Sequence, residues 1–247
     1  MRQAEADAEK AVALAPEEAD GYAARGLLRS NFSWDWSGAQ ADLAKALLLD
    51  PASATVQHNY ASLLESLGRL PEAIAAAKKA IELDPLSSGD WLNLGDYLRE
   101  SGDYPAAGQA LRRALEIQPE SAFNLHILAE LQLLEGHAAE ALATSRRIEF
   151  EGLRLQCIAM AEHILGHAKE SQQALNELIA KHTQDAAYQV AAVYAGRGEK
   201  NQAFEWLERA YRQRDGGLAE LKVDPLLNSL HGDPRFKALL GKMNLPE

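Results

Sequence analysis

The sequence has a single cysteine, Cys157, among its 247 residues, and no run of about 18 apolar residues that could span a bilayer. One cysteine excludes an intrachain disulfide and a metal site built from several thiolates. The first ten residues, MRQAEADAEK, lack the apolar core of a secretory signal peptide. We therefore expect a cytoplasmic protein from a reducing compartment, without a membrane span.

Basic residues are also scarce, because 25 Lys and Arg stand against 36 Asp and Glu, for a formal net charge of −11. Proteins that hold a phosphate backbone need clustered Lys and Arg. We therefore expect no nucleic acid to be bound by this chain, and a protein or peptide partner that is neutral or basic. The alternative is that the acidity serves solubility alone.

Aromatic residues make up only 6% of the chain, whereas alanine recurs through nearly every segment. Alanine is the best helix former, and its small side chain lets helices approach closely. The 9 prolines fall at segment boundaries or in first helical turns, where a helix tolerates them. This pattern predicts an all-α protein.

Proline and glycine recur with a period of 34 residues. The glycines are Gly68, Gly102 and Gly136, and the prolines are Pro51, Pro85 and Pro119. Residues 88–119 make up one such period. Its characteristic residues, in order, are Trp91, Leu94, Gly95, Gly102, Tyr104, Ala107, Ala114 and Pro119. This is the pattern of the tetratricopeptide repeat, a helix–turn–helix unit that buries its apolar face only by stacking on further copies. The sequence predicts a right-handed α-α superhelix.

The expected array has three parts. Residues 1–16 read as the second helix of a truncated repeat, and residues 17–214 as about six helix pairs. The opening half-repeat suggests a fragment of a longer protein. The expected helices before Ala54 cover 3–15, 18–31 and 38–50. After Pro119 the glycine spacing falls to 30 and then 32, ending at Gly166 and Gly198, which indicates shorter helices or tighter linkers in that half.

Residues 215–247 leave the repeat pattern and contain two Asp-Pro steps, at Asp224 and Asp233. An aspartate before a proline typically caps the N-terminus of a helix. We expect two short helices here, and their apolar residues would seal the open end of the array as a helical cap.

Three segments resemble one bacterial group more specifically. They are FSWDWSGAQADLAKALLLDP near the start, AFEWLERAYRQRDGGLAELKVDPLL in the last repeat and DPRFKALLGKMNLP at the end. The chain is similar to the C-terminal tetratricopeptide region of multi-domain signalling proteins that begin with a winged-helix, cyclase-type or kinase domain. The resemblance implies a sensor or interaction module that regulates an attached output domain. None of those output domains has its motifs in this sequence.

Catalytic and metal-binding patterns are weak. His163 and His167 are four residues apart, but Gly166 should end their helix, and no H-E-x-x-H order is present. Cys157 is expected to be a buried, inert thiol. We therefore expect no enzyme activity, no cofactor and no metal.

The first helix of each pair should line the concave groove of the superhelix. In this register Asn59 and Asn93 are equivalent, and their amides could clamp the backbone of an extended peptide. Tetratricopeptide receptors for chaperone tails have lysines beside such asparagines, which grip a peptide carboxylate. This chain has His58 and Leu92 there instead, although Arg99 could supply one positive contact. The candidate groove residues are His58, Asn59, Asn93, Asp96, Arg99, Phe123, His126 and Glu130.

Two further features leave alternatives open. The residues Phe123, His126, Ile127, Glu130, Leu133, Leu134, Leu153, Gln156, Met160 and Tyr188 form either an exposed apolar stripe or part of the core. Trp36 is expected to pack, whereas Trp34 replaces a turn glycine and could be an exposed anchor. The favoured function is a non-catalytic scaffold for a protein or peptide. The alternative is an array that binds no peptide and instead self-associates, for example as a homodimer, or senses a small ligand.

Overall fold

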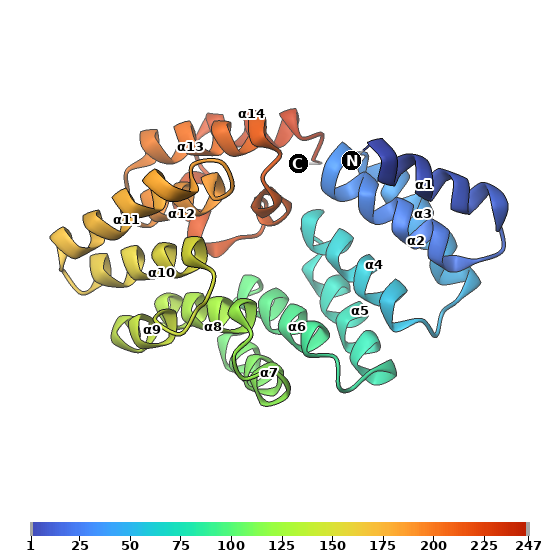
Figure 1. Ribbon diagram of the computed structural model, residues 1–247, viewed down its shortest axis with the longest axis horizontal. Coiled ribbons are helices and arrows are strands. Elements are labelled where there is room, and N and C mark those ends of the chain that lie inside the picture. The colour runs from blue at the N-terminus through green and yellow to red at the C-terminus, as the bar shows by residue number, and fades with distance from the viewer. Residues whose placement is uncertain (1, 246–247) are drawn as a thin grey trace.

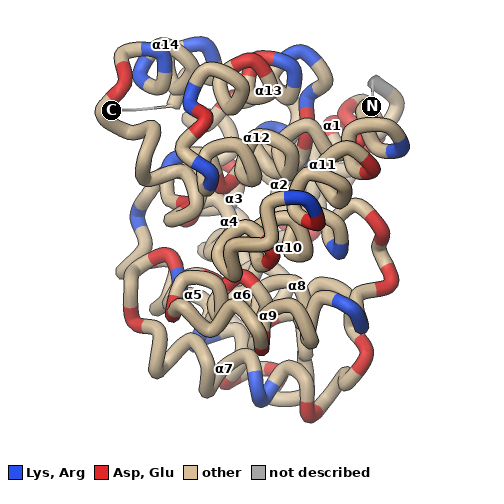
Figure 2. The backbone as a smooth tube through the Cα atoms, turned by 90° about the vertical axis from the view of Figure 1, so that its left-hand side faces the viewer, with Lys and Arg blue, Asp and Glu red and all other residues tan. Residues whose placement is uncertain are grey.

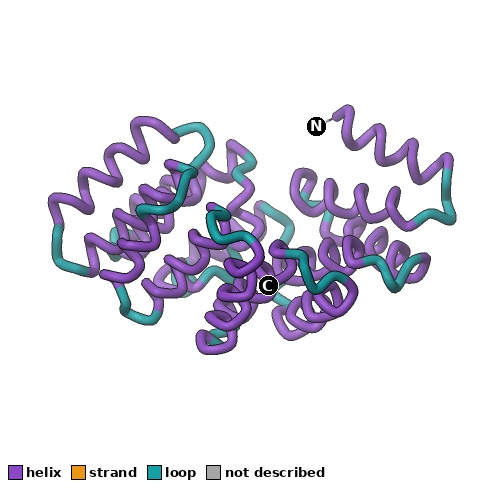
Figure 3. The backbone as a smooth tube through the Cα atoms, turned by 60° about the horizontal axis from the view of Figure 1, so that its bottom comes forward, coloured by secondary structure: helices purple, strands orange, loops and turns teal. Residues whose placement is uncertain are grey.

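The structure is a computed structural model that describes residues 2–245 as an array of antiparallel helices (Figure 1). Met1, Pro246 and Glu247, the ends of the expected terminal segments, lie outside this range. The helices are α1 (Arg2–Leu14), α2 (Ala19–Leu28), α3 (Trp36–Leu49), α4 (Ala54–Ser66), α5 (Leu70–Leu83), α6 (Ser88–Glu100), α7 (Tyr104–Ile117), α8 (Ala122–Leu134), α9 (Ala138–Ser145), α10 (Glu151–Ile164), α11 (Ala168–His182), α12 (Ala187–Gly196) and α13 (Lys200–Gln213). Short loops join them (Figure 3). The predicted all-α solenoid is confirmed.

The same capping interactions mark the helix ends in each regular repeat. Ser53, Ser87 and Ser121, which are 34 residues apart, accept a hydrogen bond from a backbone amide in the first turn of α4, α6 and α8. At the opposite end of α6, Gly102 has a φ of 84°, a left-handed conformation that costs other residues energy. These caps set where each helix begins and ends.

Glycine inside α6 has a separate role, because it sets how closely the two helices of a repeat approach. A Cβ atom on Gly95 would lie 2.7 Å from Cγ of Leu111 on α7. Gly26 stands in the same relation to Leu43, at 2.8 Å, in the pair formed by α2 and α3. A side chain at either position would force the helices apart, so these two helix pairs require glycine there.

The two tryptophans of the first pair join the two ends of the array. Trp34 has a φ of 53° at the position of the turn glycine and follows a π-helical turn, η1 (Arg29–Ser33). It is only 5% exposed, its ring centroid lies 5.2 Å from that of Tyr211, and the Arg214 guanidinium covers it. The idea of Trp34 as an exposed anchor is therefore wrong. Trp36 is buried as expected, and its Nε1 donates to the carbonyl of Met243 at 2.7 Å.

The C-terminal segment starts inside the arc of helices (Figure 1). It contains two 3-10 helices, η2 (Gly216–Glu220) and η3 (Pro225–Leu230), and then α14 (Pro234–Lys242). Both Asp-Pro starts are confirmed, since Asp224 accepts from the amide of Leu226 and Asp233 from that of Arg235. The sequence pattern did not predict η2, which contacts both α4 and α12.

The C-terminal segment, residues 215–245, which we call the tail, contacts more of the array than the last helix pair. Leu226, Leu227 and Leu230 are buried against α12, while α14 packs on α13. Lys222 Nζ donates to the carbonyl of Leu67, across the arc on the turn after α4. The tail therefore links the last repeat to the early ones, and the first helix pair meets the last pair and the tail through Trp34 and Trp36.

The irregular half agrees with the spacing of its glycines. Helix α9 has 8 residues, whereas its counterparts α5 and α7 have 14 each. The predicted shortening after Pro119 is thus located in α9 and in α12, which has 10 residues where α4, α6 and α8 have 13. Within residues 2–245 none of the helices combines the length and the apolar character needed to cross a bilayer.

Candidate functional site

The concave face contains two adjoining cavities, of about 330 and 460 Å³, which we call the concave groove. Both are bordered by Asn93 and Asp96 of α6 and by Gly216 and Glu220 of η2. The tail therefore forms one wall of the groove along its length. The groove is narrower than the open arc of helices alone would make it.

Most of the predicted site residues line this groove. They are His58, Asn59, Asn93, Asp96, Phe123, His126 and Glu130. Arg99 does not: its side chain is 0% exposed and lies within a buried polar network. The expectation that Arg99 offers a positive contact to a peptide is wrong, because the tail covers the end of α6 where it lies.

The two asparagines occupy equivalent positions on α4 and α6. Both border the larger cavity, and neither amide hydrogen-bonds to another residue within the described range 2–245. His58 is already engaged, because its Nδ1 lies 2.6 Å from Oδ1 of Asp90. The amides of Asn59 and Asn93 thus lie one repeat apart along the cavity, as the sequence register predicts.

Arg99 is the centre of the buried network. Its Nε and Nη2 contact Asp96 Oδ1 at 2.8 and 2.7 Å, and its Nη1 lies 3.6 Å from both Glu130 and Asp224. The Tyr188 hydroxyl donates to the other oxygen of Asp224 at 2.8 Å. Helices α6, α8 and α12 and the tail therefore meet at one buried guanidinium.

A second charged pair lies beside it on α8. His126 Nε2 is 3.2 Å from Glu130 Oε1, and the Gln156 amide donates to the same oxygen at 2.9 Å. Burial disfavours the Glu130 carboxylate, but His126 and Arg99 outweigh that effect and lower its pKa to about 2. Burial likewise opposes the His126 imidazolium, yet the Glu130 charge raises the pKa of His126 well above its usual value.

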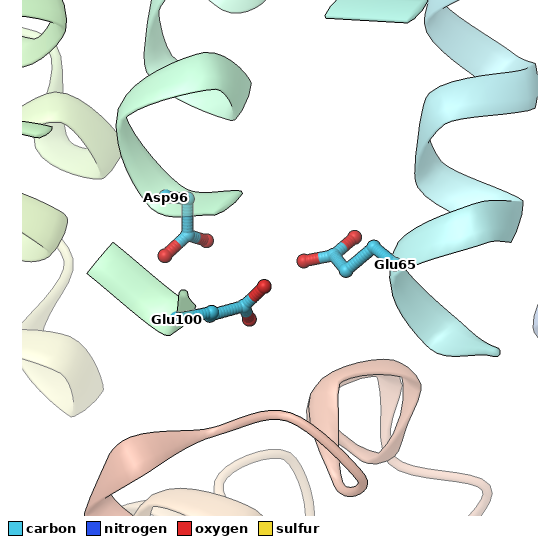
Figure 4. A group of neighbouring side chains, drawn as sticks. All are labelled: Glu65, Asp96 and Glu100. Carbon is cyan, nitrogen blue, oxygen red and sulfur yellow. The ribbon is translucent and has the colours of Figure 1, made fainter. Parts of the chain in front are cut away.

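Three further carboxyl groups converge next to Arg99, namely those of Glu65 on α4 and of Asp96 and Glu100 on α6 (Figure 4). One oxygen from each lies within 4.8 Å of the others. Burial raises the pKa of all three groups, and their mutual repulsion adds to the effect for Glu65 and Glu100. Of the residues that the structure describes, these three form the one acidic, histidine or cysteine cluster compact enough for a metal ion.

The sequence analysis missed this cluster. Glu65, Arg99 and Leu133 are 34 residues apart, so two charged residues occupy a repeat position that elsewhere holds a buried leucine. Charged residues at a core position are rare unless they are paired. That substitution of charge for leucine was the available signal.

At the apolar end of the groove, fewer side chains are exposed than the predicted apolar stripe contains. Phe123 and Phe150 are 55% and 53% exposed, and their rings meet edge to face with centroids 5.4 Å apart. Four members of the stripe are at most 7% exposed and belong to the core: Ile127, Leu133, Met160 and Tyr188. The core interpretation is therefore correct for most of the stripe, and Phe123 is the exposed exception.

The remaining reactive side chains are Cys157, which hydrogen-bonds with His126, and the two histidines at the end of α10. Cys157 is fully buried, as expected. His167 Nδ1 lies 2.7 Å from Glu162, while His163 and His167 are both exposed at the end of α10. Lys and Arg are spread over separate helices in Figure 2, without one large basic patch in that view.

Comparison with known families matches tetratricopeptide repeat models to residues 54–85 and 76–109. Comparison with curated protein sequences gives no match. Among solved structures, a chain of the APC/C hetero-tetramer Cut9-Hcn1 superposes with a TM-score of 0.67 at 18% identity over 98% of this chain. This chain spans 45% of the length of that one.

Two further structures are similar. PilW, a widely conserved type IV pilus biogenesis factor, has a TM-score of 0.67 and 24% identity over 78% of this chain and 90% of its own. PilF of Pseudomonas aeruginosa has a TM-score of 0.59 and 19% identity over 83% of this chain and 95% of its own. At such identities the likeness concerns the fold. Tetratricopeptide repeat models thus match residues 54–109, and antiparallel helices continue on both sides of that region, from α1 to α13.

Proposed function

We propose that this chain is a non-catalytic scaffold that binds an extended segment of a protein partner in the concave groove. One observation carries the proposal: the amides of Asn59 and Asn93 lie one repeat apart along the same groove without a partner among the described residues. A side-chain amide both donates and accepts, so a pair of them can hold a peptide backbone whatever its sequence. Tetratricopeptide arrays generally mediate contacts between proteins, which agrees with this role.

The walls of the groove favour a neutral or basic segment. Asp96, Glu130 and Glu220 border it, and the whole chain has a net charge of −11. Phe123 and Phe150 at one end offer an aromatic contact for an apolar residue of the partner. The ligand that fits is an extended peptide with a basic centre and an apolar side chain near α8.

A role as the regulatory module of a larger cytoplasmic signalling protein rests on the resemblance of the sequence segments. The compared solved structures, from the APC/C and from pilus biogenesis, give no support to signalling. We likewise propose, as an alternative, a homodimer that buries the exposed rings of Phe123 and Phe150.

A second candidate function, sensing of a small ligand, is favoured by the size of the cavities. At about 330 and 460 Å³ they fall within the range of roughly 300 to 1,000 Å³ that small-molecule sites occupy. Because η2 closes one side of the groove, a compact ligand fits without displacing the tail.

The test uses a displayed library of random peptides to select a binder, followed by calorimetric titration of that peptide. We expect the double variant Asn59→Ala, Asn93→Ala to bind at least about tenfold more weakly, since two or more hydrogen bonds are lost. Its melting temperature should stay close to that of the parent.

Asn176→Ala, on an exposed position of α11, is the matched control and should bind normally. Unchanged affinity in the double variant would reject the asparagine clamp. A library that yields no binder, combined with a small compound that raises the melting temperature, would instead favour the ligand-sensing alternative.

A further inference from the structure

The cluster of Glu65, Asp96 and Glu100 lies where two repeats and the tail meet. Glu65 is in the last turn of α4, and Asp96 and Glu100 are one helical turn apart on α6. In Figure 4 the Glu65 and Glu100 carboxyl groups point toward one another, with Asp96 above them. The three ligand oxygens all lie within 4.8 Å of one another.

Besides Nη1 and Nη2 of Arg99, two buried polar groups at this point have no hydrogen-bond donor or acceptor of ordinary geometry among the described residues. The Glu100 side chain is 0% exposed, and the facing Glu65 carboxyl group is the one side chain that can share a proton with its oxygens. The Tyr97 hydroxyl, on a residue that is 1% exposed, is also without a partner. Tyr97 borders the same cavity as Glu65 and Asp96. Burying polar groups without partners is costly, so such groups indicate a ligand that satisfies them.

The neighbouring cation does not fill this need. Arg99 uses Nε and Nη2 on Oδ1 of Asp96, and its Nη2 is 4.0 Å from the nearest Glu100 oxygen, beyond hydrogen-bonding distance. Its Nη1 lies between Glu130 and Asp224. The second oxygen of Asp96 and both oxygens of Glu100 remain available on the side that faces Glu65.

We propose that Glu65, Asp96 and Glu100 bind one hard divalent cation of the Ca²⁺ class. The donors are all carboxylate oxygens, which Ca²⁺ prefers, and no soft ligand belongs to the cluster. Oxygens on opposite sides of a bound Ca²⁺ are about 4.6 to 5.2 Å apart, twice the usual metal–oxygen distance, which matches the spread of the cluster.

Water from the adjoining cavity of about 460 Å³ completes the coordination. That cavity also contains Glu220 of η2, and the charge of Glu220 raises the pKa of Glu65, so the two carboxyl groups are close. A cation between α4 and α6 therefore attracts the tail as well. The ion would hold the tail against the early repeats whatever molecule the groove binds.

The experiment titrates the full chain, first treated with a chelator, with CaCl₂ and in parallel with MgCl₂ by calorimetry at neutral pH and moderate salt. We expect one Ca²⁺ to bind per chain, with a melting temperature that rises with the Ca²⁺ concentration. Glu100→Gln, which keeps the side-chain volume, should weaken Ca²⁺ binding at least about tenfold because one charged ligand is lost.

Glu116→Gln, an exposed carboxyl on α7, is the control and should bind like the parent. The Glu100→Gln chain should fold, because a neutral amide there removes repulsion within the cluster. The absence of Ca²⁺ binding up to about 10 mM would overturn the proposal. Binding that survives in both Glu65→Gln and Glu100→Gln would also overturn it. Stabilisation by acid alone, without any response to Ca²⁺, would show that a shared proton occupies the cluster instead.

Discussion

Arg99 on α6 and Asp224 at the start of η3 form a buried ion pair, with Nη1 and Oδ1 3.6 Å apart. Asp224 also accepts the Tyr188 hydroxyl and caps η3, so one side chain fixes the path of the tail. Because Arg99 in turn contacts Asp96 and Glu130, the tail is bound to two repeats in the middle of the array. The position of the tail is thereby coupled to the shape of the groove.

Deletion of residues 224–247 should lower the stability of the chain markedly. It removes Leu226, Leu227, Leu230 and Phe236 from the core and leaves Arg99 with one fewer buried partner. Each fully buried apolar side chain contributes about 1.5 to 3 kcal/mol. Thermal unfolding followed by circular dichroism measures the effect. A melting curve identical to that of the full chain would mean that the tail does not contribute to the core.

Trp36→Phe should cost about 1 kcal/mol in the free energy of unfolding. The substitution removes the buried hydrogen bond from Nε1 to the Met243 carbonyl and leaves that carbonyl without the donor. Trp91→Phe is the matched control, because Trp91 Nε1 donates to the Pro85 carbonyl at an exposed site, where water can replace it. Equal losses for the two variants in urea titrations would contradict a special role for the link between α3 and the tail.

Gly95→Ala should destabilise the chain by about 1 to 3 kcal/mol, the usual cost of overpacking. The added Cβ would lie 2.7 Å from Leu111 Cγ, and another atom of that leucine is 2.8 Å away. Gly89→Ala in the same helix has its nearest contact at 3.9 Å, so it should be neutral or stabilising by up to about 1 kcal/mol. The pair of variants is compared by urea unfolding. A harmless Gly95→Ala would show that α6 and α7 can separate without cost.

The stability of the chelator-treated chain should fall between mildly acidic and mildly alkaline pH. Burial raises the pKa of Glu65, Glu100 and Glu220 in the folded state, so these groups hold protons more tightly when folded. Their contribution is complete below the unfolded pKa of about 4 and is lost as the pH rises toward the folded pKa. His126, with its raised pKa, acts in the same direction from about pH 6.5 upward.

Glu130 opposes this trend at the acidic end, since its pKa of about 2 gives stability that is lost as the pH falls below about 4. The optimum should therefore be mildly acidic. Urea midpoints across the pH range measure the profile, and the double variant Glu65→Gln, Glu100→Gln should flatten its alkaline limb. A stability that rises steadily with pH would be inconsistent with the buried carboxyl cluster.

The sequence by itself determined the repeat. Serine caps and turn glycines act within one helix pair, so their 34-residue spacing is enough to specify helix ends, and Gly95 sets the contact between α6 and α7. The register also placed Asn59, Asn93 and Phe123 on the concave side, where the structure has them. Two Asp-Pro steps likewise predicted the starts of η3 and α14.

Only the tertiary structure decided what the concave side contains. Arg99 has the register of a groove residue, yet it is buried because the tail returns across the arc and places Asp224 beside it. Glu65 and Glu100 meet where α4 and α6 of adjacent repeats pack together, and Trp34 is covered by Tyr211 from the last repeat. Periodicity reports which face of a helix meets its neighbour in sequence. It does not show which repeats, distant in the sequence, come into contact where the two ends of the superhelix meet.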